Sequence, residues 1–269
     1  MKKVIFVLFI LSTIYSCSKT ESAPPVTKLS SCDSVKQALF LLTTSDSVRL
    51  VSCLTITGCD SISLGILKPS TQDLLRLNCN ISSITIGTQI WMKMNLDIVT
   101  YRNGDIIPQV TDPTAWAGLT TGAWCYYNNN NTTTGSKYGK LYNWYAVNDS
   151  RGLAPRGWHI PTQAEWIALG NRLDGSDVAG GKLKEAGTLN WKSPNANATN
   201  ITGFTALPGG GRSPNGQFFY FGTDADFWSA TQSNSTEAFL SGLTYLNGGL
   251  STNITNGKKG GYSIRCIRD

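Results

Sequence analysis

The sequence has little of what metal sites and many enzymes depend on. It contains one histidine, His159, in 269 residues, and none of its seven cysteines stands in C-x-x-C spacing. Zinc and redox sites commonly use such pairs, so both kinds of site are disfavoured. A catalytic triad would have to use the one histidine.

Charge is also scarce. Asp, Glu, Lys and Arg make up 15% of the chain, against the roughly 25% of a typical globular domain. The formal net charge is +6, and two of the positive charges, Lys2 and Lys3, belong to the N-terminal segment discussed next, which leaves +4 (6 − 2) for the remainder. The basic residues do not cluster, so nucleic-acid binding is not expected.

No apolar run is long enough to span a bilayer. The longest covers residues 4–14 and follows two lysines, as the core of a signal peptide follows its basic start. It ends at Ser16 and Cys17, an arrangement that resembles a bacterial lipoprotein signal, in which the cysteine is acylated. We therefore predict a lipoprotein signal peptide over 1–16, lipidation of Cys17 and a lipid anchor in the membrane. The expected location is the cell envelope, at the outer membrane or cell surface. The alternative is an ordinary secretory signal with an incidental cysteine.

The next segments read as a tether and a repeat. Residues 17–30 have no hydrophobic period and contain two adjacent prolines, which is typical of an extended tether. Residues 31–82 contain two units that begin and end with cysteine. Without Cys17 the chain has six cysteines, an even number that favours disulfides over a metal site in an exported protein. Four cysteines allow three pairings, and the simplest joins Cys32 with Cys53 and Cys59 with Cys79. We therefore predict a small disulfide-stapled repeat segment.

The same segment contains three Asp-Ser-aliphatic triplets, at Asp33, Asp46 and Asp60. Asp and Ser commonly cap helices and form turns, which is the favoured interpretation. The triplets also resemble acceptors for periplasmic O-glycosylation in some bacteria, and this alternative stays open.

From residue 84 the pattern is that of short strands separated by turns. Alternating apolar and polar residues on both sides of Gly87 predict a tight hairpin. Thr162 and Glu165 predict a capping box that opens a helix ending near Gly175, which explains Glu165 better than catalysis does. A second short helix is predicted over 181–187.

Motifs that follow one another over 83–269 resemble a known family. They include Ile-Gly-Thr-Gln-Ile-Trp-Met at 86–92, Leu-Tyr-Asn-Trp-Tyr-Ala at 141–146, Gly-Trp-His-Ile-Pro-Thr at 157–162 and Gly-Tyr-Ser-Ile-Arg-Cys at 261–266. This stretch resembles the FISUMP, or major paralogous, domain of bacterial surface lipoproteins, which is itself similar to the C-type-lectin-like fold of formylglycine-generating enzymes. The resemblance implies an α+β, C-type-lectin-like domain with twisted antiparallel sheets, few helices and long loops. It implies no known catalytic activity.

The chain departs from that family at its cysteines. Members often have a cysteine before the Gly-Trp-His motif that pairs with the terminal Arg-Cys, and here the corresponding position is Ala154. The comparison implies that Cys266 pairs with Cys125 or stays a buried free thiol. Formylglycine-generating enzymes bind copper with a cysteine pair near the end of the domain. Cys266 is the only cysteine after Cys125, so neighbouring positions cannot supply such a pair, and no cofactor is expected.

Two sets of side chains are candidates for ligand contacts. Asp224 and Asp226 are weak calcium candidates, and a solvated turn is the favoured interpretation of them. Aromatic residues beside polar loops can stack on sugars or anchor a protein partner; these are Trp116, Trp124, Tyr126, Tyr127 and Tyr220. His159 lies in an apolar setting and is interpreted as a structural, hydrogen-bonded histidine rather than a base or ligand.

These observations predict a non-enzymatic cell-envelope lipoprotein. It would bind a polysaccharide or a protein partner through the loops of its C-type-lectin-like domain. One alternative is an enzyme related to formylglycine-generating oxidases with altered chemistry. The other is a purely structural envelope protein.

Overall fold

The computed structural model describes residues 82–269, one of the two units into which the chain divides. The predicted signal peptide, tether and cysteine repeat lie outside the described residues, together with Cys17, Cys32, Cys53, Cys59 and Cys79. Within residues 82–269, no helix has both the length and the apolar character needed to cross a membrane.

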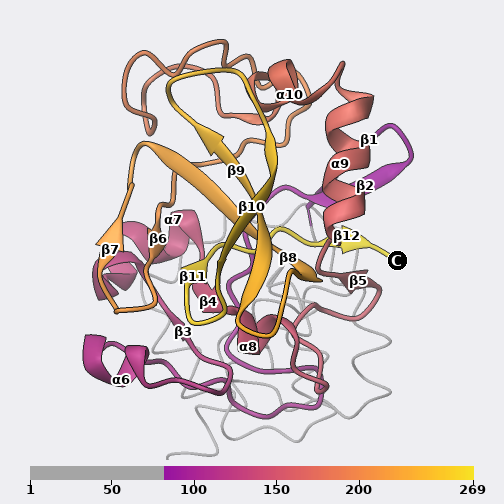
Figure 1. The fold of residues 1–269 in the computed structure, drawn as a ribbon. Helices are drawn as coiled ribbons and strands as arrows, with labels where there is room; N and C mark the ends of the chain where they lie inside the picture. The colour runs from indigo at the N-terminus through magenta and orange to yellow at the C-terminus, as the bar shows by residue number, and fades with distance from the viewer. Residues whose placement is uncertain (1–81) are drawn as a thin grey trace, which may run out of the picture. The chain divides into compact units, whose positions relative to one another are not determined.

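Three antiparallel sheets make up most of the regular structure of this unit (Figure 1). The first has the order β1 (Ser83–Ile86), β2 (Gln89–Met92), β12 (Ile267–Arg268) and β5 (Trp158–His159). The second has the order β10 (Ser251–Gly257), β9 (Glu237–Thr244) and β8 (Asp224–Gln232). The third has the order β3 (Trp124–Cys125), β4 (Leu141–Asn143), β11 (Gly261–Tyr262), β6 (Gly211–Arg212) and β7 (Phe218–Phe219).

Helices are few and short in the same unit. The two longest are α9 (Gln163–Arg172) and α10 (Ser176–Leu183). The others span one turn or little more: α6 (Pro113–Ala117), η2 (Tyr127–Asn129), η3 (Asn131–Gly135), α7 (Ser136–Tyr138) and α8 (Trp144–Val147). The predicted α+β class, with antiparallel sheets, few helices and long loops, is confirmed.

Local signals placed the hairpin and the first helix correctly. β1 and β2 pair with Ile86 opposite Gln89, so Gly87, at φ +64°, supplies the turn. The Thr162 side chain accepts from the backbone N–H of Glu165, and the Glu165 carboxylate accepts from the backbone N–H of Thr162 at 2.8 Å. The predicted capping box of α9 is therefore confirmed.

The second helix was placed wrongly. Helix α10 ends at Leu183, and Lys184 already has extended backbone. Its start carries no side-chain cap, so the sequence lacked the usual signal. Close packing explains its two glycines, because a Cβ on Gly180 would lie 1.8 Å from the carbonyl oxygen of Gly249, and one on Gly181 would lie 2.3 Å from that of Asn197.

The core that joins the first two sheets is built on aromatic rings. Trp91 of β2 and Trp166 of α9 have ring centroids 4.7 Å apart, and Trp166 stacks on Phe227 of β8 at 5.5 Å. All three side chains are fully buried. Helix α9 therefore fastens β2 to β8 through large ring contacts.

Buried cations hold the long loops. Lys184 is fully buried, and its Nζ donates to the carbonyl oxygens of Ala196, Thr244 and Asn247 at 2.8–2.9 Å. Buried charges must be hydrogen-bonded, and irregular loops leave carbonyl groups free to accept. The other buried cations that donate to backbone carbonyls are Lys140, Arg212, Lys258 and Arg265.

The two cysteines of this unit do not pair. Cys125 and Cys266 are both buried and both free, so the predicted disulfide between them is wrong and the alternative of a buried free thiol is confirmed. Cys125 lies in β3 and Cys266 directly precedes β12, and these strands belong to different sheets. Burial raises the pKa of each thiol to about 12, so both stay protonated.

Candidate functional site

Four aromatic side chains from separate segments form a cluster that reaches the surface. We call Tyr127, Tyr138, Phe218 and Phe221 the aromatic cluster. The ring of Phe221 lies 4.7 Å from that of Tyr127 and 4.9 Å from that of Tyr138, and Tyr127 lies 5.2 Å from Phe218. Phe221 is 37% exposed, Tyr127 and Phe218 are half-buried, and Tyr138 is buried. The cluster thus has a buried base and an open top.

A strained turn between β7 and β8 presents Phe221. Tyr220 has φ +59° and Gly222 has φ +80°, so Phe221 lies between two left-handed residues. The carbonyl of Tyr220 accepts from the N–H groups of Thr223 and Asp224 at 3.1 and 3.0 Å. A non-glycine residue at positive φ is uncommon, and such strain persists only where the surroundings fix it. The turn therefore holds Phe221 in one position.

Polar side chains lie at one side of the cluster. Asn190 Oδ1 accepts from Lys137 Nζ at 2.6 Å and from the Tyr138 hydroxyl at 3.3 Å. Asn190 Nδ2 donates to both carboxylate oxygens of Glu185 at 2.8 Å. Burial, and then the nearby Glu185 carboxylate, raise the pKa of Tyr138. An apolar ring surface beside a few convergent polar groups is typical of a ligand site.

A recess of 370 Å³ adjoins the cluster, and we call it the basic recess. Two of its lining residues lie next to the cluster in the chain or in space. Lys137 directly precedes Tyr138. Leu207 directly precedes Pro208, whose carbonyl accepts from the N–H of Gly222, the residue after Phe221, at 3.0 Å. Its lining consists of Lys93, Met94, Asn95, Lys137, Thr205, Leu207 and Arg265.

The predicted ligand-surface aromatics divide into two groups. Trp116 and Trp124 lie in the core, so the prediction is wrong for both. Their indole N–H groups donate to the carbonyl oxygens of Lys259 and Ile107, each at 2.8 Å. Backbone carbonyls from other segments of the chain therefore satisfy both indole N–H groups inside the core.

The three predicted tyrosines keep some exposure. Tyr126 is half-buried, and its hydroxyl donates to Asp97 Oδ1 at 3.2 Å. Tyr127 belongs to the aromatic cluster, and Tyr220, beside Phe221, is 61% exposed. Sequence reasoning missed Tyr138, Phe218 and Phe221. The unbroken aromatic run at 218–221 was the signal that could have found the last two.

Asp224 and Asp226 lie in strand β8, so their interpretation as a solvated turn is wrong. Asp226 pairs with Gly242 across the sheet, and its Oδ1 lies 2.7 Å from where a Cβ on Gly242 would stand. Burial, and then the nearby Asp224 carboxylate, raise the pKa of Asp226 to about 7. Calcium prefers six to eight oxygen ligands. In the part of the chain that the structure describes, no group of three or more His, Cys, Asp or Glu side chains is placed to hold a metal.

His159 is hydrogen-bonded on both ring nitrogens, as predicted for a structural histidine. Nε2 lies 2.8 Å from Glu165 Oε1, and Nδ1 lies 2.9 Å from Asp269 Oδ1. Burial alone would lower the pKa of His159, but the hydrogen bonds to the two carboxylates outweigh it, and the pKa is raised. Asp269 was missed because it lies far away in sequence.

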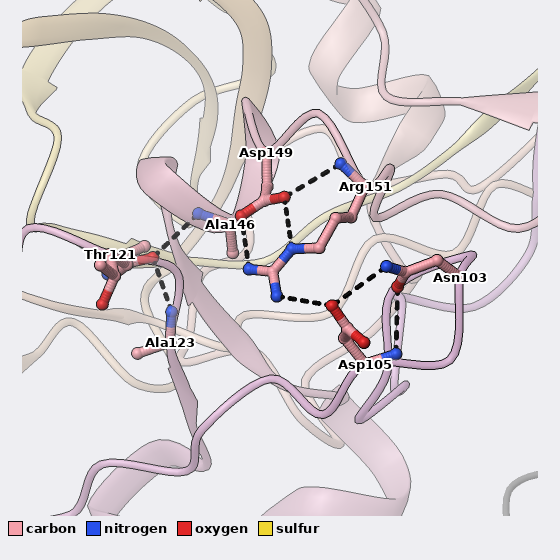
Figure 2. A network of polar contacts seen from close by, with 8 residues as sticks. Asn103, Asp105, Thr121, Ala123, Ala146, Asp149 and Arg151 are labelled. Carbon is pink, nitrogen blue, oxygen red and sulfur yellow. Dashed lines mark hydrogen bonds and ion pairs between the residues drawn. The ribbon is translucent and has the colours of Figure 1, made fainter.

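Two further carboxylates, those of Asp105 and Asp149, form ion pairs with Arg151. Figure 2 shows Arg151 between Asp149 and Asp105, which come from two loops. The guanidinium donates to Asp149 at 2.8 and 2.9 Å and to Asp105 at 3.0 Å. The hydrogen bond from Arg151 lowers the pKa of Asp149 to about 2. These carboxylates fasten one loop to the other and are not free to bind a cation.

The described residues thus form an α+β domain of three antiparallel sheets with a surface aromatic cluster. Comparison with protein families matches residues 84–268 to the Fibrobacter succinogenes major domain, and the chain belongs to this family. The predicted FISUMP resemblance is confirmed, while the similarity to C-type-lectin-like folds stays a prediction. A comparison with curated proteins found no match. Family membership suggests a surface or envelope protein.

Proposed function

We propose that the protein is a non-enzymatic, lipid-anchored component of the cell envelope that binds a polysaccharide on the aromatic cluster. One observation carries the proposal: the rings of Phe221 and Tyr127, 4.7 Å apart and partly exposed, are held on a fixed turn. Sugars present C–H groups that stack on aromatic faces, and a rigid platform loses little entropy on binding.

The polar neighbours of the cluster support a sugar rather than a purely apolar ligand. Asn190, Glu185 and Lys137 offer an amide, a carboxylate and an ammonium group beside the rings. Sugar hydroxyls both donate and accept hydrogen bonds, so they need such mixed partners. The cluster therefore provides stacking and orientation together.

The non-enzymatic part of the proposal is supported by the state of the reactive groups. Both thiols of the described residues are buried and protonated, and both nitrogens of His159 are engaged by carboxylates. A nucleophile or general base needs an accessible, activated atom. An oxidase with altered chemistry remains the competing function. Cofactor-dependent oxidation of a cysteine peptide by the purified protein would establish it.

A protein partner is a second candidate ligand, favoured by one observation. Strand β10 is an edge strand, and its sequence Ser-Thr-Asn-Ile-Thr-Asn-Gly carries no charge or proline. Such an edge can accept a further strand from another polypeptide. Substitution of Thr255 by proline would abolish that mode and leave polysaccharide binding unchanged.

Binding to a polysaccharide panel tests the proposal. We expect Phe221→Ala to weaken binding about 10-fold, as loss of a central aromatic contact commonly costs more than 1 kcal/mol. Phe239→Ala is the matched control, because Phe239 is half-buried on β9 and outside the cluster. Equal affinities of the two variants and the unaltered protein would rule out the aromatic cluster as the binding surface.

Anchoring is tested separately. Mass spectrometry of the protein from its native membrane is expected to show an acylated Cys17 as the first residue. An unmodified Cys17 would remove the lipid anchor from the proposal without touching the binding surface.

A further inference from the structure

The basic recess beside the aromatic cluster carries positive charge without a counter-charge. Lys93, Lys137 and Arg265 line it, and none of its lining residues is acidic. Its volume of 370 Å³ falls within the range of small-molecule sites, about 300–1,000 Å³. The recess therefore combines the size of a ligand site with a potential that attracts anions.

Arg265 is the buried, fixed charge of this recess. Its side chain is 1% exposed, and its guanidinium donates to Asn95 Oδ1 at 2.7 and 2.9 Å and to the carbonyl of Phe204 at 2.7 Å. It also donates to the carbonyls of Met92 and Lys93. All of these acceptors are neutral. Among the described residues, no carboxylate lies within ion-pair distance of Arg265.

A buried guanidinium without an anion is incompletely compensated, although carbonyl dipoles satisfy its N–H groups. Burial lowers the pKa of Arg265 to about 9, so the group is still charged at neutral pH. An anionic group in the recess would supply the missing negative charge, and folding has already desolvated the guanidinium, so the remaining desolvation cost is mainly that of the anion.

The two lysines extend the positive charge toward the aromatic cluster. Lys137 is held by Asn190 Oδ1 at 2.6 Å, and its Nζ lies 5.9 Å from the ring centroid of Tyr138. Lys93 is exposed and has no ion pair within residues 82–269. The nearby carboxylate of Glu185 does not line the recess, and the Asn190 amide donates to both its oxygens.

We propose that the basic recess binds the anionic group, carboxylate or sulfate, of an acidic polysaccharide whose neighbouring sugar ring stacks on Phe221 and Tyr127. The inference rests on the proposed function and names the class of its ligand. Lys137 and Tyr138 both donate to Asn190 Oδ1, and the Tyr138 ring lies 4.9 Å from that of Phe221, so the two subsites are neighbours.

Polygalacturonate and its fully methyl-esterified form test the proposal, because the two share a backbone and differ in charge. Dextran sulfate serves as the sulfate arm, and inorganic phosphate as the free-anion arm. We expect the full-length protein to bind polygalacturonate more tightly than the ester, with an affinity that falls as salt rises. The double variant Lys93→Gln/Lys137→Gln is expected to lose about 3- to 10-fold in affinity for polygalacturonate, the range of two exposed ion pairs.

The matched control is Arg156→Gln, which removes one positive charge from an exposed side chain that lines neither the recess nor the cluster. Its affinity for polygalacturonate is expected to stay unchanged. Tighter binding of dextran sulfate than of polygalacturonate would support the recess with sulfate as its ligand group.

Failure of the acidic-ligand inference and failure of the proposed function give different results. Equal binding of polygalacturonate and its ester, or a double variant that behaves like the control, would overturn the acidic ligand and leave the proposed function standing. Binding of inorganic phosphate with no binding of any polysaccharide, charged or neutral, would overturn both.

Discussion

Replacing Asp226 by asparagine is expected to stabilise the protein at alkaline pH and to have no effect near pH 4. Asp226 pairs with Gly242 on the adjacent strand, and no described residue is seen to donate a hydrogen bond to its carboxylate. Burial, and then Asp224, raise its pKa from 3.8 to about 7. Tyr262 of the third sheet also faces it, and because burial, and then Asp226, raise the pKa of Tyr262, its phenol is neutral in this pH range.

The sign follows from proton binding. Between pH 3.8 and about 7 the folded protein holds a proton on Asp226 that the unfolded chain has released. This contribution to stability is complete below the unfolded pKa and is lost as pH rises through the folded pKa. Asparagine resembles the protonated acid at every pH, so the variant escapes the loss.

The pKa shift of Asp226 sets the size of the expected gain in stability. A shift of about three units corresponds to about 4 kcal/mol at 1.36 kcal/mol per unit. The side chain retains some solvent contact, which reduces the expected gain to about 2 kcal/mol. That gain would raise the Tm by about 4–8 °C at pH 8 for a domain of this size.

Thermal unfolding of Asp226→Asn and of the unaltered protein, followed by circular dichroism from pH 4 to pH 9, measures this difference. Asp177→Asn is the control, because Asp177 is exposed and lies on α10, away from strand β8. A Tm difference that is the same at pH 4 and pH 8, or a less stable Asp226→Asn at pH 8, would refute the reasoning.

The remaining predictions concern packing and the thiols. Lys184→Met removes the buried ammonium group that three backbone carbonyls share and is expected to lower the free energy of unfolding in urea by about 3 kcal/mol; an unchanged midpoint would contradict this. Thr162→Ala removes the N-cap of α9 and is expected to cost about 1 kcal/mol, whereas Thr162→Ser should restore most of it in the same assay. Cys125 and Cys266 are expected to react with iodoacetamide only after denaturation and without added reductant, as seen by peptide mass spectrometry. A need for reductant would show a disulfide instead.

Short-range signals in the sequence were sufficient for the parts of the fold that short-range forces determine. The glycine turn at Gly87 and the capping box at Thr162 and Glu165 each involve residues within four positions of one another. Helix α10 lacks a side-chain cap, so its start at Ser176 left no comparable signal. The antiparallel α+β class came from the family resemblance, whereas the spacing of turns indicated only short strands.

Contacts between distant residues determined the rest. The Arg212 guanidinium lies over Trp116, with its Cζ 4.5 Å from the centroid of the Trp116 ring. Arg212 also donates a hydrogen bond to the carbonyl of Val110, 102 positions away. The partner of His159, Asp269, is 110 positions away. A single sequence does not show which loops close over an aromatic side chain, so burial of Trp116 and exposure of Phe221 could not be separated.

The central claim is that a sugar stacks on the aromatic cluster, and NMR of the ring protons tests it most directly. Protein labelled in Phe and Tyr would be titrated with oligogalacturonate. The account predicts that the ring signals of Phe221 and Tyr127 shift, while those of Phe239 and Tyr145, which lie outside the cluster, stay unchanged. Unchanged signals from Phe221 and Tyr127 under conditions in which the oligosaccharide binds would contradict the account.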